Sequence, residues 1–557
     1  MRKTFVPLQT APGESHVPFT TPNSPASTPA GRRTPRLPRA SAPIAIALVA
    51  ALSLAACSSP DAEHKSEKPE RAKATGKTDE LTVVDLDNVP DVTEETKETE
   101  ESGTTAELAY PKIPNADPLT KRLGEITDQE RDDFLGANAK AEDIKIGWNL
   151  SVAGDDVVAV RLTQDEKDDE GERTSYATYW YDTTQGTTAY STELLAGQKE
   201  LETLDGLVKK ALKDEDAADT SQLYPILRSY DSMGFNPDGD LVVEFDEGQV
   251  APVKSGRISA VIPKEDVDPL LSDFGKKAQA AAVVVTPDYR IEKPATPPKD
   301  GASAEVPGMM PVRDDSVDCS DPASKCIALT FDDGPGDRTP ELLDTLAEYD
   351  AKATFFLTGE PVREHAATVR REYAEGHELA NHTVHHPDLT RQAEVRVRAE
   401  LDTVNDLVRR ETGYSLELMR PPYGATNDAV SKISKEEGLA EIIWSVDTND
   451  WKDRNSSIVA KRAVQGAQPG AIILMHDIHG TTIDAVPSIL KQLDEKGYTM
   501  VTVSQLLGDT EPGKSYFNGH PEKKKDGADS KEDKDGKGDK DGKGNASPAS
   551  DASDSKD

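Results

Sequence analysis

The sequence is poor in cysteine. Its 557 residues include three cysteines, Cys57, Cys319 and Cys326, and none of their spacings is the Cys-x-x-Cys of zinc fingers or thiol redox sites. Cys319 and Cys326 bracket a short loop. In an oxidising exterior this pair could close a disulfide that holds the start of the following segment, and two free thiols are the alternative.

Basic and apolar residues are also scarce. The 65 Lys and Arg residues face 102 Asp and Glu residues, a net charge of −37. This balance argues against nucleic acid as a partner, because phosphates need a basic surface, and against electrostatic docking on anionic lipid. The apolar content of 35% and the charged content of 30% indicate that part of the chain does not fold.

No uncharged run near the N-terminus is long enough to cross a membrane. The run 41–56 follows an Arg-rich cluster at 32–39 and falls short of the roughly 20 residues that a spanning helix needs. We interpret residues 1–56 as a leader with a secretory signal. The ending Leu-Ala-Ala-Cys57 resembles a bacterial lipobox, which implies a lipid on Cys57 and a place on the outer face of a Gram-positive cytoplasmic membrane. A plain signal peptide is the alternative.

The composition changes several times along the rest of the chain. These changes predict an acidic disordered spacer, an α+β domain, a Pro-rich linker, a catalytic domain and a disordered charged tail. Their bounds are 57–105, 106–286, 287–318, 319–510 and 511–557.

Residues 220–275 of the α+β domain resemble the extracellular domain of lysozyme-sensing anti-sigma factors. The segment Phe235–Phe245, with Asn-Pro-Asp-Gly-Asp, and the strand-like 258–262 before Pro263 carry this resemblance. It implies a lysozyme-like or wall partner for 106–286. A spacer or wall-binding domain is the alternative.

The catalytic domain alternates short apolar segments with helical ones. Such alternation predicts a parallel sheet, and seven units predict a distorted (β/α)7-type barrel, an α/β fold. The clearest helix is expected at about 390–412, with Gly413 as its stop. The expected strands are 326–331, 354–357, 378–380, 417–420, 440–446, 471–475 and 498–502.

Two adjacent carboxylates follow the first of these strands. Asp332 and Asp333 come after the apolar run 327–331 and before a Gly-Pro turn. The carboxyl end of a strand is where α/β folds place their chemistry, so one carboxylate could bind a metal while the other accepts a proton. The alternative is an ordinary turn, since these residue types all favour turns.

Six of the ten histidines lie in two stretches of this domain. His382 and His386 are four residues apart, which predicts two imidazoles on one face of a helical turn. With Asp333 they would form a two-histidine, one-carboxylate site that suits zinc and other divalent first-row metals. His385 is the competing ligand, but it would point away from His382.

Further polar groups stand at other strand ends. His476 ends an apolar strand and is placed to act as a general acid or base, whereas His479 is expected to be a bystander. Arg420 precedes a Pro-Pro turn that leaves the Tyr423 N–H available. The segment 445–451 adds two carboxylates and a tryptophan.

Taken together, five segments resemble the motifs of the polysaccharide deacetylase family, carbohydrate esterase family 4, with the nodulation-type deacetylase domain. The resemblance implies a distorted (β/α) barrel and metal-assisted removal of acetyl groups from N-acetylated sugars. The segments are Thr330-Phe-Asp-Asp-Gly334, His382-Thr-Val-His-His386, Arg420-Pro-Pro-Tyr-Gly424, Asp447-Thr-Asn-Asp-Trp451 and Ile472-Ile-Leu-Met-His476.

The resemblance also implies residue roles on the water side of the reaction. Asp333, His382 and His386 would hold a divalent metal, zinc first, with cobalt or manganese as alternatives. Asp332 would be the general base on the attacking water, oriented by Arg420.

Other roles concern the leaving group and the sugar. The Tyr423 N–H would stabilise the oxyanion, and His476 would donate a proton to the leaving amine, with Asp447 tuning its basicity. Trp451 and Leu474 would line the substrate groove beside Tyr423.

Export and a lipid anchor would place this enzyme within reach of the wall. The first expected substrate is therefore peptidoglycan, at its N-acetylglucosamine or N-acetylmuramic acid, and the product would resist lysozyme. Chitin or poly-N-acetylglucosamine is the alternative substrate. A non-catalytic surface lipoprotein that senses glycan or lysozyme is the alternative from a different class, and the intact set of Asp and His residues argues against it.

Overall fold

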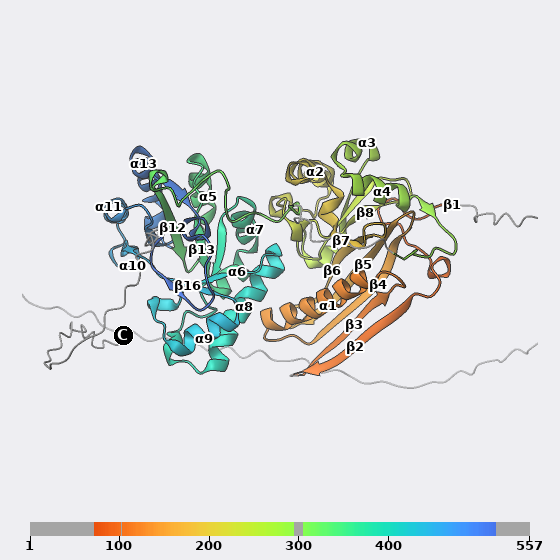
Figure 1. The fold of residues 1–557 in the computed structure, drawn as a ribbon, viewed down its shortest axis with the longest axis horizontal. Coiled ribbons are helices and arrows are strands. Elements are labelled where there is room, and N and C mark those ends of the chain that lie inside the picture. Colours follow the sequence, from red (N-terminus) through yellow and green to blue (C-terminus); the bar gives the residue numbers. More distant parts are fainter. Residues whose placement is uncertain (1–71, 102, 294–304, 520–557) are drawn as a thin grey trace, which may run out of the picture. The chain divides into compact units, whose positions relative to one another are not determined.

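The computed structural model describes residues 72–101, 103–293 and 305–519. The expected signal segment and Cys57 lie outside the described residues. The described chain forms two domains, one before and one after residues 294–304 (Figure 1). Within the described part of the chain, no helix combines the length and the apolar content that crossing a bilayer requires.

The N-terminal domain is built around a six-stranded sheet in the order β2-β3-β4-β5-β6-β7. Neighbouring strands are antiparallel except β3 and β4, which are parallel because helix α1 (Asp117–Ala137) carries the chain across between them. The strands are β2 (Thr93–Glu101), β3 (Thr104–Lys112), β4 (Asp143–Gly154), β5 (Val157–Asp168), β6 (Gly171–Asp182) and β7 (Thr187–Tyr190).

Both faces of this sheet are covered. Leu119 and Leu123 of α1 pack on one face with Ile146 and Val160, and on the other face Trp180 packs among residues of smaller elements. The domain is therefore α+β, as expected. The smaller elements are β1 (Ala72–Lys73), α2 (Gln198–Ala211), β8 (Met233–Phe235), β9 (Leu241–Phe245), β10 (Ile258–Ile262), α3 (Lys264–Val267), α4 (Asp273–Ala282) and β11 (Val284–Val285).

Part of the expected spacer is folded. β2 lies inside the segment 57–105, yet it pairs with β3 from Thr93 to Glu101. Its sequence, Thr-Glu-Glu-Thr-Lys-Glu-Thr-Glu-Glu, has no apolar residue because β2 is an edge strand held by main-chain hydrogen bonds, and charged side chains suit an edge. This strand therefore could not be predicted from the composition of the segment.

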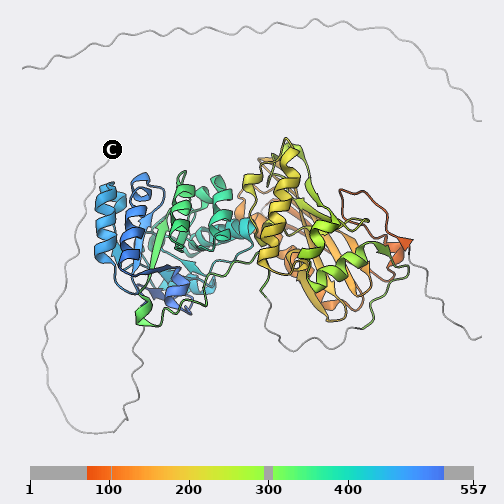
Figure 2. The ribbon, with the colours of Figure 1, turned by 90° about the horizontal axis from the view of Figure 1, so that it is seen from above.

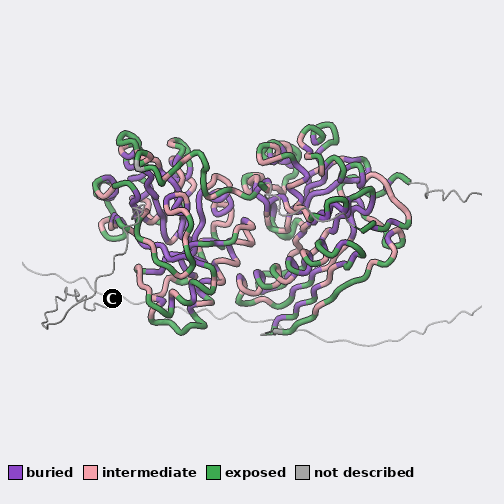
Figure 3. The backbone as a smooth tube through the Cα atoms, viewed as in Figure 1, coloured by how far each residue is buried: buried purple, intermediate pink, exposed green. Residues whose placement is uncertain are grey.

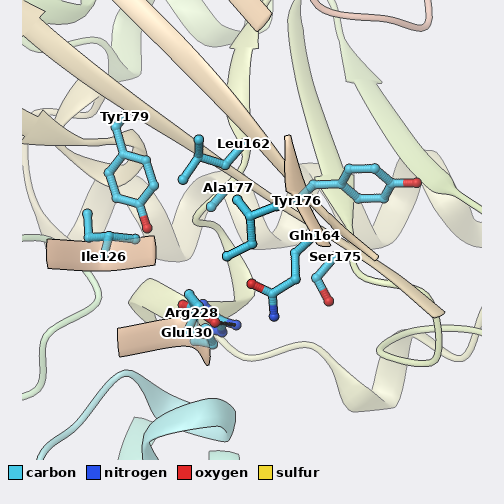
Figure 4. Close-up of a pocket in the computed structure, with 10 residues that line it drawn as sticks. Ile126, Glu130, Leu162, Gln164, Ser175, Tyr176, Ala177, Tyr179 and Arg228 are labelled. Atoms are coloured by element: carbon cyan, nitrogen blue, oxygen red, sulfur yellow. Dashed lines mark hydrogen bonds and ion pairs between the residues drawn. The ribbon is translucent and has the colours of Figure 1, made fainter. Parts of the chain in front are cut away.

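A small cavity lies between the sheet and α1 in this domain (Figure 4). Tyr179, Leu162 and Ile126 line it, and Glu130 and Arg228 lie at its polar end. Its volume of about 20 Å³ accommodates little more than one water molecule. The cavity is therefore too small for a sugar or another organic ligand.

The C-terminal domain has a nine-stranded sheet in which every pairing is parallel. The order is β17-β18-β12-β13-β14-β15-β16-β20, and β19 also pairs with β12. The strands are β12 (Cys326–Asp332), β13 (Thr354–Leu357), β14 (Glu378–Asn381), β15 (Leu418–Met419), β16 (Ala440–Ile442), β17 (Val446–Asp447), β18 (Ile472–His476), β19 (Thr499–Val501) and β20 (Ser515–Tyr516).

The sheet curls into a half-barrel with helices on its outer face (Figures 1 and 2), which confirms the predicted α/β fold class. The longest of these helices, α8, ends as predicted at Gly413, whose φ is 75°. The helices are α5 (Thr339–Glu348), α6 (Gly359–Glu364), α7 (Ala366–Ala374), α8 (Glu394–Thr412), α9 (Asp428–Glu436), α10 (Asp450–Asp453), α11 (Ser456–Gly466), α12 (Gly480–Ile483), α13 (Val486–Glu495) and α14 (Val503–Leu507).

Two details of the sheet differ from the prediction. The expected strand 440–446 is divided, since Ile443 bonds to β20 while Ser445 bonds to the β18 side of the sheet. β20 itself lies in the expected disordered tail 511–557 and pairs with β16. A two-residue strand held by main-chain bonds has no apolar periodicity to detect.

Alternation along β12 separates two cores. Ile327, Leu329 and Phe331 pack outward against the helices, whereas Cys326 and Ala328 belong to an inner core within the curl. The same alternation turns Thr330 and Asp332 inward. The buried strands of this sheet are visible as the purple interior in Figure 3. Asp332, which ends the inward-facing side chains of β12, therefore lies at the open end of the half-barrel.

Cys319 and Cys326 form a disulfide, with a Cα–Cα distance of 5.5 Å. Because the bridge closes a short loop, reducing it is expected to lower the free energy of unfolding by about 2 kcal/mol. Urea unfolding of the full chain with and without reductant measures the difference. The double variant Cys319→Ser/Cys326→Ser is the control, and a reductant effect of equal size in that variant would contradict the assignment.

Candidate active site

Three side chains converge at the carboxyl ends of β12 and β14. Asp333 follows β12, while His382 and His386 follow β14. Asp333 Oδ1 lies 3.5 Å from His382 Nε2 and 3.7 Å from His386 Nε2. One ligand atom from each residue lies within 4.8 Å of the other two. The structure thus brings together the three residues predicted to bind a metal.

The segment that joins the two histidines is not the helical turn predicted from their spacing. Residues 382–386 form an irregular loop, in which Thr383 and His386 have φ angles of 69° and 53°. These left-handed residues turn the chain so that the two imidazole centroids lie 4.9 Å apart. Non-glycine residues hold such angles only where surrounding contacts impose them.

The donors of this triad fit a divalent metal ion. Asp333 Oδ1 is buried without a hydrogen-bond partner, although it is the oxygen nearest both imidazoles. His382 Nδ1 donates to the Arg420 carbonyl oxygen at 2.7 Å, which leaves the Nε2 lone pair for a ligand. Burial lowers the pKa of His382 to about 3, so its imidazole is neutral. Two imidazoles and one carboxylate suit zinc and other first-row divalent metals.

Asp332 stands beside the triad but has a different partner. Arg420 Nη1 donates to Asp332 Oδ1 at 2.6 Å and to Thr330 Oγ1 at 2.9 Å. Both members of the ion pair are almost completely buried. Burial raises the pKa of Asp332, and the Arg420 charge opposes that rise. Its other oxygen, Oδ2, lies 3.6 Å from His382 Nε2 and so faces the metal-binding side.

His476 ends β18, which pairs with β12 on the side away from β14. Its ring atom Nδ1 contacts Asp450 Oδ1 at 2.8 Å, and its backbone N–H donates to Asp450 Oδ2 at 2.8 Å. Burial alone would lower the pKa of His476, but the Asp450 hydrogen bond and the charges of Asp332 and Asp450 raise it to about 9. His476 is therefore held in the protonated form at neutral pH, with Nε2 as its second proton donor.

Asp450 takes the place predicted for Asp447. The Asp447 carboxylate instead accepts the Asn449 N–H at 2.7 Å, which closes a turn after β17. Asn449 has a left-handed backbone, and α10 then begins at Asp450, whose side chain is buried. The spacing Asp-x-x-Asp offered both Asp447 and Asp450 as partners of His476. The position of Asp450 directly before Trp451, at the start of a short helix, is the signal in the sequence that could have favoured it.

Of the three residues predicted to contact substrate, Tyr423 and Leu474 lie beside this centre, and Trp451 follows Asp450 at the start of α10. Tyr423 and Trp451 keep exposed fractions of 70% and 51%, so both rings are free to meet a ligand. The Tyr423 ring lies 4.6 Å from the His386 ring. Leu474 is buried, and by strand alternation it shares the inward face of β18 with His476.

His385 and His479, for which no catalytic role is predicted, have different surroundings. His385 is turned away from the triad, since its Nδ1 lies 3.0 Å from Glu400 Oε1 and its side chain is 64% exposed. His479 was expected to be a bystander, yet its ring stacks on His476 with centroids 5.7 Å apart.

Together the fold and the site define a hydrolase-like centre: a triad suited to a divalent metal, a buried carboxylate and a protonated imidazole at the open end of a curled α/β sheet. The family model for polysaccharide deacetylases matches residues 320–442. The chain belongs to the polysaccharide deacetylase family.

Three similar proteins illustrate the relationship. The peptidoglycan-N-acetylglucosamine deacetylase PgdA of Listeria monocytogenes is 46% identical over 35% of this chain and 42% of its own length. The peptidoglycan-N-acetylmuramic acid deacetylase PdaC of Bacillus subtilis is 42% identical over 33% and 39%. A peptidoglycan-N-acetylglucosamine deacetylase of Bacillus cereus is 37% identical over 33% of this chain and 88% of its own length. The chain therefore spans about two fifths of the first two relatives.

Proposed function

We propose that this protein is a metal-dependent N-deacetylase that removes acetyl groups from the amino sugars of a cell-wall glycan. One observation carries the proposal. The triad Asp333, His382 and His386 lies beside a second carboxylate, Asp332, which is paired with Arg420. The protonated His476 ends β18, the strand paired with β12, at whose carboxyl end the two aspartates lie. Amide hydrolysis needs these components together: a metal site, a base for water and an acid for the amine.

The metal, when bound, supplies Lewis-acid polarisation of the acetyl carbonyl and of water. Asp332 accepts the proton of the attacking water at Oδ2, because Arg420 occupies Oδ1. The Tyr423 N–H donates to the oxygen that becomes negative in the tetrahedral intermediate. His476 donates its Nε2 proton to the sugar nitrogen as the carbon–nitrogen bond breaks, which leaves acetate and a free amine.

Peptidoglycan is the proposed polymer, at N-acetylglucosamine or N-acetylmuramic acid. All three relatives described above are named for peptidoglycan, two for the first sugar and one for the second. We call the exposed rings of Tyr423 and Trp451 the proposed substrate rim. These two rings suit a sugar, because apolar sugar faces pack on aromatic side chains. Chitin and poly-N-acetylglucosamine remain the alternative substrates.

The location of the enzyme is part of the proposal. We infer export and a lipid on Cys57, which would hold the enzyme at the outer membrane face beside the wall. The free amines that it produces would then weaken lysozyme binding. Residues 106–286 are proposed to contact the wall or a lysozyme-like protein, on the resemblance of 220–275.

The decisive test is acetate release from purified peptidoglycan by the full chain. A chelator is expected to reduce the rate by at least about 100-fold, and added zinc is expected to restore it, because the metal carries much of the transition-state stabilisation. Release from chitin oligomers but not from peptidoglycan would change the substrate. No release from either, with metal bound, would favour the non-catalytic sensor.

A further inference from the structure

A buried glutamate on α8 holds the loop between the two histidine ligands. Glu400 is only 1% exposed, and none of the five family motifs includes it. Its Oε2 accepts the N–H groups of Val384 and His385 at 3.0 and 2.8 Å. Its Oε1 faces the His385 ring at 3.0 Å and the Arg396 guanidinium at 2.8 Å. The two oxygens therefore have separate partners, backbone on one side and side chains on the other.

The N–H groups of Thr383 and His386 have short-range partners. The Thr383 N–H donates to Asn381 Oδ1 at 2.8 Å, and the His386 N–H donates to Thr383 Oγ1 at 3.1 Å. Asn381 is itself anchored on α8, where its Nδ2 donates to the Leu401 carbonyl oxygen and to Asn405 Oδ1. The start of the loop is held by β13, where the Leu357 carbonyl oxygen accepts the His382 N–H at 2.9 Å. The middle of the loop is held by Glu400.

The hydrogen bonds to Glu400 stabilise a loop whose backbone is strained. Thr383 and His386 flank the two residues that Glu400 holds, and both have left-handed backbones. Because one oxygen of Glu400 accepts both intervening N–H groups, Glu400 can stabilise a conformation that the sequence would not adopt alone. The conformation matters because it brings His386 back to within 3.7 Å of Asp333.

We propose that Glu400 is a positioning residue, whose Oε2 sets the place of His386 in the metal site before the metal arrives. The inference rests on the proposed function, since it assumes that the triad binds a metal. Glu400 touches neither the metal ligands' donor atoms nor the proposed substrate rim. Its effect acts through the backbone of Val384 and His385.

Zinc affinity of the full chain, measured by competition with a chromophoric chelator, tests the proposal. Glu400→Ala is expected to weaken zinc binding by about 10–100-fold, the usual effect of losing a group that orients a ligand. Glu400→Gln keeps an oxygen for both N–H groups and should stay within about 3-fold of the wild type. The matched controls His385→Ala and Arg396→Ala remove only the partners of Oε1 and should also stay within about 3-fold.

The visible spectrum of the Co²⁺-loaded protein adds a readout of geometry. A changed spectrum in Glu400→Ala, restored in Glu400→Gln, would support positioning, because a purely structural role would leave the bands of the bound metal unchanged. Wild-type zinc affinity in a folded Glu400→Ala variant would overturn the proposal. So would an equal loss of affinity in Arg396→Ala. A wild-type chain that binds no metal would instead overturn the proposed function.

If Glu400→Ala does not fold, hydrogen exchange on the metal-free wild type decides the question. The amides of Val384 and His385 should exchange on the order of 100-fold more slowly than in an unstructured chain, because Glu400 already holds them. Unprotected amides in the metal-free protein would overturn the proposal, since the loop would then form only with metal.

Discussion

Replacing Asp332 with asparagine is expected to lower kcat for acetate release by about 10³-fold, within the range that a general base contributes. Asparagine keeps the volume of the side chain and an oxygen for Arg420, but it cannot accept a proton. Loss of the negative charge also leaves Arg420 buried without a counter-ion, so some loss of stability should accompany the loss of rate. Acetate release from peptidoglycan at saturating metal measures the effect.

Two controls separate this effect from a loss of metal or of fold. Zinc content of Asp332→Asn should match the wild type, because Asp333 rather than Asp332 belongs to the triad. Asp337→Asn removes a carboxylate in the loop after β12 whose side chain is 97% exposed, and it should leave the rate unchanged. An Asp332→Asn enzyme that keeps full activity with bound metal would remove Asp332 from the mechanism.

Replacing Asp450 with asparagine is expected to move the basic limb of the kcat/KM profile to lower pH by about one to two pH units, since a hydrogen bond to a charged group contributes about 1.5–3 kcal/mol. The sign follows from the charge. The Asp450 carboxylate stabilises the imidazolium of His476 and helps to raise its pKa to about 9. Without that charge His476 loses its proton at lower pH, and the acid form that serves the leaving amine is depleted. At pH 9 the rate should fall by about 5–50-fold, because half of the wild-type His476 is still protonated there and only about 1–10% of the variant's is.

The matched control is Asp447→Asn. Asp447 accepts the Asn449 N–H, and among the hydrogen bonds of the described residues none joins its carboxylate to His476. This variant should therefore keep the basic limb where the wild type has it. A shift in Asp447→Asn together with a wild-type profile in Asp450→Asn would reverse the assignment made from the structure.

The long, regular elements of the C-terminal domain could be predicted from sequence because local patterns determine them. The apolar run before Asp332 forms the predicted strand, β12, and the periodic segment 390–412 contains the predicted helix, α8, which ends at its glycine. β2 and β20 could not be predicted in this way. Each is held through main-chain bonds to a neighbouring strand, and such bonds place no requirement on the side chains.

Within the candidate site, motifs in the sequence alone identified the residues to which we assign roles: Asp333, His382 and His386 as proposed metal ligands, Asp332 as the proposed base and His476 as the proposed acid. These residue types stand at strand ends, and in a parallel sheet all carboxyl ends meet at one edge. The neighbours of these residues, by contrast, became clear only from the folded chain. The turn at Asn449 selects Asp450 over Asp447, and a helix distant in sequence brings Glu400 to the loop of His386. Such choices depend on the backbone angles of irregular segments, which carry no periodic pattern in the sequence.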